Sequence, residues 1–200
     1  PKAHLNSKGG KDMMTAAKVL LAMTPPEIVS INQQVILSPN KDQRSRGLAF
    51  SLHQSTPRTR TIWLNSNPEI SLSSLLDTYY HETGHSLAKL IGNEKITNPP
   101  TKYKEAVLLS PQSPSGYVLK EDERLSVERF PNRSMNAGVE RFADAFAIYA
   151  SIEFGQPGKD FDNFVEMLDP QFAFFDEIVI ELQNNPLTET PPEYFQNLYR

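Results

Sequence analysis

The sequence predicts an α+β fold in which a small twisted sheet precedes a long helix, and a mainly helical C-terminal part follows. Three short segments alternate apolar and polar residues or are rich in β-branched residues, which is typical of strands: 34–37, 47–53 and 60–65. After residue 71 the apolar residues change to a 3.6-residue period, which indicates a helix that Gly92 can end. Two further helical segments, 136–153 and 160–184, follow a long proline-rich stretch, and the second can hold one or two helices.

Length and composition narrow the classes of protein that this chain can be. Its 200 residues, of which 38% are hydrophobic and 22% charged, suit one soluble globular domain. A net charge of −4 without a long basic run argues against nucleic acid or an anionic membrane as a partner. No apolar run reaches the roughly 18–20 residues of a transmembrane segment. The absence of cysteine excludes a disulfide scaffold and any thiolate metal site.

The predicted organisation is a short lead-in followed by a single domain. Residues 1–12 are polar and contain Gly9-Gly10, so we expect a mobile segment, with a short helix starting at Met13. The stretch at 93–132, between the first long helix and the helix at 136–153, is mainly irregular and long enough to form a functional loop. Within the domain 13–200, we divide the chain into the sheet and first long helix at 27–92, a loop-rich segment at 93–135 and a helical part at 136–200.

One segment carries a motif with a defined chemistry. His81-Glu82-Thr83-Gly84-His85 is an H-E-x-x-H motif inside the first long helix. Helical residues four apart lie on the same face, so both imidazoles can reach one metal ion. Glu82 is turned by about 100° from His81, so it flanks that ion and can reach a bound water. Two nitrogen ligands, an open coordination position and a carboxylate base are typical of a zinc hydrolase.

The alternative is that two histidines fall at helical spacing by chance. The periodicity of the helix argues against it, because His81 and His85 project from nearly the opposite side to the apolar stripe. Histidines in that position are poor candidates for the core and good candidates for ligands. The stripe comprises Leu72, Leu76, Tyr79, Thr83, Leu87 and Leu90.

Two features beside the motif bear on how such a site would work. Gly84 stands inside the helix, where it costs about 1 kcal/mol relative to alanine, and we interpret it as a point of close approach by another backbone or by substrate. The strand at 60–65 is either an edge to which an extended substrate adds as an extra strand, or a structural strand on which Trp63 packs. His53 is the last residue of the predicted strand at 47–53. It is either an exposed polar residue or a residue that contacts the metal or the substrate.

Two histidines leave a zinc site one protein ligand short of three. Glu140 is the best candidate for the third, with Asp144 one turn later on the same face, where it can accept a hydrogen bond from a ligating imidazole. Ala143 and Ala147 border the two acids, so this helix can approach the first closely. The alternative is that both acids belong to the solvated face of an amphipathic helix; the need for a third ligand favours the metal site.

The two motif helices together resemble a known family. An H-E-x-G-H helix followed by Glu140-Arg-Phe-Ala-Asp-Ala-Phe146 resembles the zinc metallopeptidases related to anthrax lethal factor, which include the bacterial Pro-Pro endopeptidases. The segment 168–180 is similar to the C-terminal helix of those catalytic domains. The resemblance covers roughly residues 72 to 182 and is strongest in the two motif helices.

This resemblance implies a zincin-like fold with one zinc ion per chain. It implies His81, His85 and Glu140 as ligands, Glu82 as general base, and Asp144 as the partner of a ligating imidazole. The family carries a tyrosine seven residues before the ligand Glu, thought to stabilise the oxyanion, where this chain has Arg133. Tyr149 projects from the opposite face of its helix and cannot replace that tyrosine. The residues that can take this role after folding are Arg133, Tyr117, Tyr103 and His53.

The function that these residues predict is zinc-dependent endopeptidase activity on a peptide or protein substrate. By resemblance, the setting is a secreted or host-translocated bacterial toxin or effector domain, and we favour a monomer. Two alternatives stay open. One is a zinc hydrolase of a non-peptide amide, and the other is a metal-stabilised module that binds peptides without cleaving them.

Overall fold

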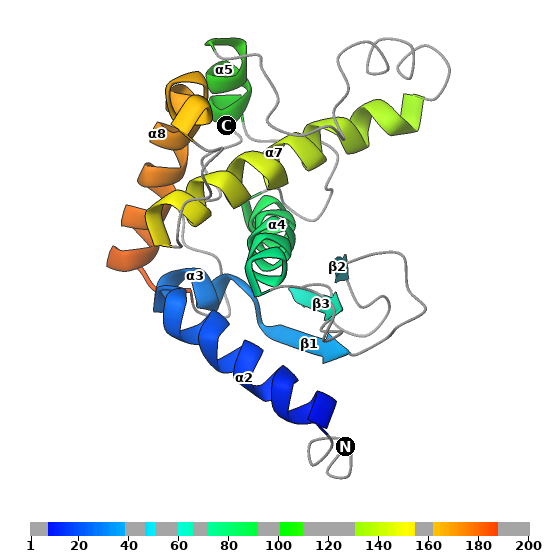
Figure 1. Cartoon of the computed structure of the whole chain (residues 1–200). Coiled ribbons are helices and arrows are strands. Elements are labelled where there is room, and N and C mark those ends of the chain that lie inside the picture. The colour runs from blue at the N-terminus through cyan, green and yellow to red at the C-terminus, as the bar shows by residue number, and fades with distance from the viewer. Residues whose placement is uncertain are drawn as a thin grey trace.

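The computed structural model describes seven stretches of the chain. These are residues 8–38, 47–50, 60–65, 72–91, 101–109, 131–154 and 162–187. Helices make up most of them, and a small sheet lies against the helix that carries the motif (Figure 1). None of the helices in these stretches is both long and apolar enough to cross a membrane.

The sheet has three strands in the order β1-β3-β2, where β1 spans Gln34–Ser38, β2 spans Gly47–Phe50 and β3 spans Thr61–Asn65. β1 runs parallel to β3, and β2 runs antiparallel to it. β3 is therefore the central strand, with both of its edges hydrogen-bonded. The hypothesis that this strand is the substrate-aligning edge is wrong, because it has no free edge; the structural alternative fits, and the side chain of Trp63 is half-buried.

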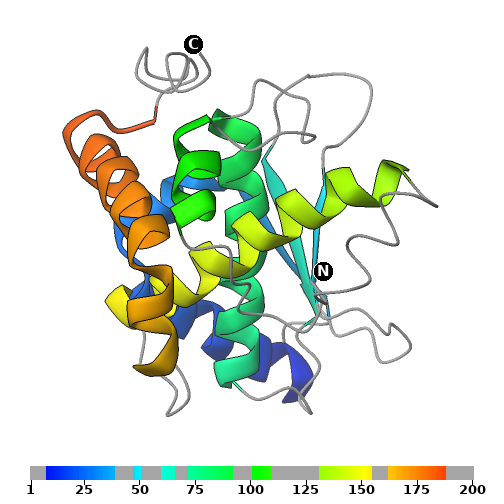
Figure 2. The same ribbon diagram turned by 90° about the horizontal axis from the view of Figure 1, so that it is seen from above.

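Helix α4 (Leu72–Ile91) lies at the centre of the described structure. It packs on β2 and β3 on one side, and helix α7 (Pro131–Phe154) crosses it on the other (Figures 1 and 2). The stripe read from the sequence is buried where its side chains are described, from Leu76 to Leu90. Burial extends beyond the stripe to Tyr80, Ser86 and Ala88, because α4 has neighbours on more than one side.

The face of α7 turned away from α4 builds an aromatic core. Phe142 and Phe146 each lie with their ring centroids 5.3 Å from that of Phe175 in α8 (Asp162–Asn184). Tyr103 of α5 (Thr101–Leu109) adds a ring 4.8 Å from Phe142. All three contacts are edge-to-face, which is a favourable aromatic geometry. They hold α7 between α4 and the α5–α8 pair, so the position of α7 is fixed from both sides (Figure 1).

Two short N-terminal elements complete the described core. Helix α2 (Lys8–Met23) ends just before Pro25, since the residue that precedes a proline is disfavoured in the helical conformation. Helix α3 (Pro26–Ile31) starts on a proline, whose missing N–H is not needed at a helix start. Ile28 and Ile31 of α3 are fully buried.

The boundaries of three predicted segments are corrected by the structure. α2 begins at Lys8, so the expected helix start at Met13 is wrong, and residues 8–12 of the expected lead-in belong to this helix. The rest of that lead-in, residues 1–7, lies outside the described residues. α7 begins at Pro131 rather than at Asn136, because proline is favoured in the first turn of a helix. The loop-rich segment 93–135 therefore contains a helix, α5, and the start of α7. α8 is a single helix that continues through Pro170.

Candidate metal centre

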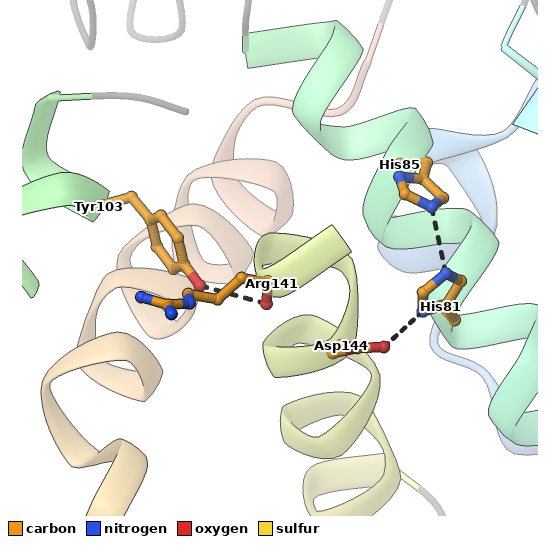
Figure 3. Close-up of polar contacts among 5 residues, drawn as sticks. All are labelled: His81, His85, Tyr103, Arg141 and Asp144. Atoms are coloured by element: carbon orange, nitrogen blue, oxygen red, sulfur yellow. Dashed lines mark hydrogen bonds and ion pairs between the residues drawn. The ribbon is translucent and has the colours of Figure 1, made fainter. Parts of the chain in front are cut away.

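Helix α4 brings the two motif histidines together. The Nε2 atoms of His81 and His85 lie 3.1 Å apart, and their rings are nearly perpendicular with centroids 4.7 Å apart (Figure 3). Both side chains are partly exposed, in contrast to the buried stripe. One helical turn therefore presents two imidazole nitrogens to the same point.

The other ring nitrogen of His81 contacts the neighbouring helix. Its Nδ1 lies 2.8 Å from Oδ1 of Asp144 in α7, and the two side chains are 24% and 12% exposed (Figure 3). A carboxylate only accepts hydrogen bonds, so Nδ1 must carry the proton and donate it. In a neutral imidazole this leaves the lone pair on Nε2, the nitrogen that faces His85.

The facing nitrogens fit a bound metal ion. Zinc binds histidine nitrogen at about 2.0–2.1 Å in a tetrahedral arrangement, which places two ligating nitrogens about 3.3–3.4 Å apart. The 3.1 Å between Nε2 of His81 and Nε2 of His85 is close to that spacing. In the absence of a cation, the same spacing suits a hydrogen bond from His85 Nε2–H to Nε2 of His81. The donor set of two imidazoles with a carboxylate behind one of them is typical of zinc sites.

The contact between α4 and α7 depends on Gly84. A Cβ built at this position would lie 2.8 Å from Cα and 3.1 Å from the carbonyl oxygen of Ala143. No real Cβ approaches a backbone atom to 2.8 Å. The interpretation of Gly84 as a point of close approach by another backbone is thereby confirmed.

Thr83, the third residue of the motif, is hydrogen-bonded to a distant part of the chain. Thr83 is fully buried; its hydroxyl donates to the carbonyl oxygen of Tyr79 at 2.7 Å and accepts from Nδ2 of Asn32 at 2.8 Å. Asn32 directly follows α3, so this pair joins α4 to the N-terminal elements. Sequence reasoning missed this contact, since neither residue signals a partner 51 positions away. The only available signal is a polar residue inside an otherwise apolar stripe.

Glu82 is almost fully buried, at 6% exposure, next to the partly exposed His81. A buried carboxylate is costly unless it is paired or hydrogen-bonded. A buried position one residue after His81 therefore suits a functional group better than a solubilising one.

The expected third ligand can be placed only by its backbone. Glu140 lies in α7 one helical turn before Asp144, and its side chain is outside the described part of the structure. Among the side chains that are described, no group of three or more His, Asp or Glu is arranged to hold a metal ion. The assignment of Glu140 stays a prediction.

Of the four candidates for stabilising an oxyanion, the structure describes the side chain of one. Tyr103 is buried on the far side of α7 from the histidines (Figure 3). Its hydroxyl donates to Oε1 of Gln171 at 2.7 Å. Burial raises the pKa of the Tyr103 hydroxyl well above its ordinary value. This placement argues against Tyr103 in that role. Arg133 lies in α7 without a described side chain, and Tyr117 and His53 fall outside the described residues.

Tyr149 lies where the helix periodicity predicts, away from the histidines. Its hydroxyl donates to Oδ1 of Asp176 in α8 at 2.8 Å, and its ring packs 5.4 Å from that of Phe175. It therefore belongs to the contact between α7 and α8.

Comparison of the chain with protein-family models, with curated proteins and with solved structures found no match. The function is therefore inferred from the residues themselves. Among the described residues, the arrangement of His81, His85 and Asp144 gives the most specific indication of a chemical function.

Proposed function

We propose that this chain is a zinc-dependent endopeptidase. The observation that carries the proposal is the pair of Nε2 atoms of His81 and His85, 3.1 Å apart, with Nδ1 of His81 bonded to Asp144. Hydrogen bonding of the second ring nitrogen to a carboxylate is the usual setting of a histidine that binds a metal. It fixes the tautomer, orients the ring and makes Nε2 a stronger ligand.

The roles of the residues follow from this arrangement. His81, His85 and Glu140 would hold the ion, and zinc when bound would polarise the scissile carbonyl and lower the pKa of water. Glu82 would accept the proton of the attacking water and return it to the leaving amine. Asp144 would keep His81 in the tautomer with a proton on Nδ1.

The edge of the sheet supports a peptide as substrate rather than a small amide. With β3 in the centre, β2 is an outer strand of the described sheet, and it also contacts α4. An extended peptide that adds to such an edge is held by main-chain hydrogen bonds along its length. β2 thus takes the role of substrate-aligning edge, which was one of the two interpretations of the strand at 60–65.

The wider setting of the proposal comes from the resemblance of the two motif helices to the lethal-factor-related peptidases. On that basis we propose a zincin-like fold and a secreted or host-translocated toxin or effector domain. The described order of a small sheet, the motif helix and a crossing helix with the second acidic motif is compatible with this.

Replacement of Glu82 by glutamine tests the proposal. Glu82→Gln keeps the size and helix propensity of the side chain and removes the base, so fold and zinc content should persist. The wild type should cleave members of a diverse peptide library. The variant should cleave the same peptides about 10²–10⁴-fold more slowly, the usual loss for general acid–base catalysis. Affinity for an uncleaved peptide should be retained.

Two other results would replace the proposal. If wild type and Glu82→Gln bind peptides equally and neither cleaves any, the chain is a metal-stabilised peptide-binding module. If wild type hydrolyses small amides and leaves peptides intact, it is a zinc hydrolase of another substrate class.

A further inference from the structure

We propose that Gly84 is a positioning residue of the metal centre, which lets α4 and α7 cross with backbone in contact so that Asp144 reaches Nδ1 of His81. This inference rests on the proposed function, because it assigns the glycine of the motif a role toward the same site. In a helix interior glycine costs about 1 kcal/mol relative to alanine, so its presence needs a compensating reason. The crossing with α7 supplies one.

The geometry at the crossing leaves no space for a side chain. A Cβ at Gly84 would meet Cα of Ala143 at 2.8 Å, its carbonyl oxygen at 3.1 Å and its Cβ at 3.3 Å. The two nearest atoms belong to the backbone of α7, so no side-chain rotation can relieve the contact. An added methyl group must move one helix relative to the other.

The size of that movement can be worked out. An ordinary contact of this kind is 3.4–4 Å long, so the helices would separate by about 0.6–1.2 Å from 2.8 Å. α7 cannot tilt away freely, because its opposite face packs against Phe175 and Tyr103. The separation is therefore transmitted along the crossing rather than absorbed by solvent.

The histidine–carboxylate contact is next to this crossing on both helices. His81 is three residues before Gly84 on α4, and Asp144 directly follows Ala143 on α7. A displacement of about 0.6–1.2 Å along the line from Nδ1 to Oδ1 would lengthen the 2.8 Å contact to about 3.4–4.0 Å, outside hydrogen-bond range. His81 would then lose the partner that holds its tautomer, although both residues are unchanged.

The first experiment uses the metal-free protein labelled with ¹⁵N-histidine. In the wild type, NMR should show His81 with its proton on Nδ1. Gly84→Ala and Asp144→Ala should both lose this tautomer. The matched control is Phe142→Leu, which disturbs the neighbouring position of α7 on the α8 side; it should lower the melting temperature and keep the tautomer.

The second experiment measures zinc affinity by competition with a chelator. Gly84→Ala should weaken zinc binding by about 10–100-fold, the range for loss of a partner of a ligating histidine. Because Gly84 acts through Asp144, the double variant Gly84→Ala/Asp144→Ala should bind zinc about as weakly as Asp144→Ala alone. A merely destabilising substitution, such as Phe142→Leu, should leave the affinity of the folded protein unchanged.

The proposal is overturned if Gly84→Ala keeps both the Nδ1–H tautomer and the zinc affinity, or if its effect adds fully to that of Asp144→Ala. If the wild type binds no zinc, the proposed function fails, while the tautomer comparison still decides the role of Gly84. If Gly84→Ala does not fold, Ala143→Val adds bulk from the other helix at a fully buried position. It is judged by the same tautomer and affinity criteria.

Discussion

The carboxylate of Asp144 is the part of the candidate metal centre whose removal has the best-defined effect. Asp144→Asn keeps the shape of the side chain and removes its charge. Oδ1 then becomes either a weaker neutral acceptor or, after rotation of the amide, a donor that opposes the Nδ1–H tautomer of His81. Both outcomes make Nε2 of His81 a poorer ligand, so we expect weaker zinc binding.

Two separate estimates give the magnitude. Loss of a hydrogen-bond partner of a ligating histidine typically weakens metal affinity by about 10–100-fold, which corresponds to about 1.4–2.8 kcal/mol. A hydrogen bond to a charged group contributes about 1.5–3 kcal/mol. The 2.8 Å distance and the 12% exposure of Asp144 justify this range, because the contact is short and largely shielded from water. The two estimates agree.

The assay is competition for zinc between the protein and a coloured chelator at fixed pH. The matched control is Asp176→Asn, the same substitution in a carboxylate that accepts a 2.8 Å hydrogen bond from Tyr149 on the other side of α7. It should leave the zinc affinity at the wild-type value. Equal affinities for wild type and Asp144→Asn would refute the reasoning, as would equal losses in Asp144→Asn and Asp176→Asn.

Two further predictions concern the core around the site. Tyr103→Phe removes the donor to Oε1 of Gln171 and should lower the free energy of unfolding by about 0.5–1.5 kcal/mol. Urea denaturation should show this loss, and the zinc affinity should be unchanged. A large loss of peptide cleavage would restore Tyr103 as an oxyanion candidate. Burial raises the pKa of Tyr79 to about 12. The unfolded chain loses that proton near pH 10 and the folded protein only near pH 12, so Tyr79 by itself should make stability fall between these values by about 1.4 kcal/mol per pH unit. Tyr103, whose pKa burial also raises, adds to the fall. Urea denaturation from pH 9 to 12 should show a decline that is shallower in Tyr79→Phe than in the wild type by about this contribution, and equal slopes in the two proteins would contradict it.

Local patterns predicted the elements that build the candidate site. The 3.6-residue periodicity and the motif predict α4 and the side from which His81 and His85 project. The same 3.6-residue periodicity puts Asp144 on the face of α7 opposite Phe142. In the structure Asp144 contacts His81 of α4, and Phe142 is buried against α8. The glycine in a helix interior indicated a close backbone contact. What Asp144 does for a metal ion stays a prediction.

Features that depend on distant pairing could not be predicted in this way. The alternation in residues 60–65 marks a strand and says nothing of its neighbours, so the central position of β3 was missed. α5 was missed because prolines surround it and its periodicity is weak; its helix is supported by the burial of Tyr103 against α7 and α8. The hydrogen bond between Asn32 and Thr83 joins segments that have no common sequence signal.

The most direct test of the central claim is the amount of zinc bound per chain. The wild-type protein, saturated with zinc and then dialysed, should retain one ion per chain by elemental analysis. His81→Ala, His85→Ala and Glu140→Ala should each retain far less, and Glu82→Gln should retain the wild-type amount. A wild-type protein that retains no more zinc than His85→Ala would contradict the account, and full zinc retention by Glu140→Ala would contradict the third ligand alone.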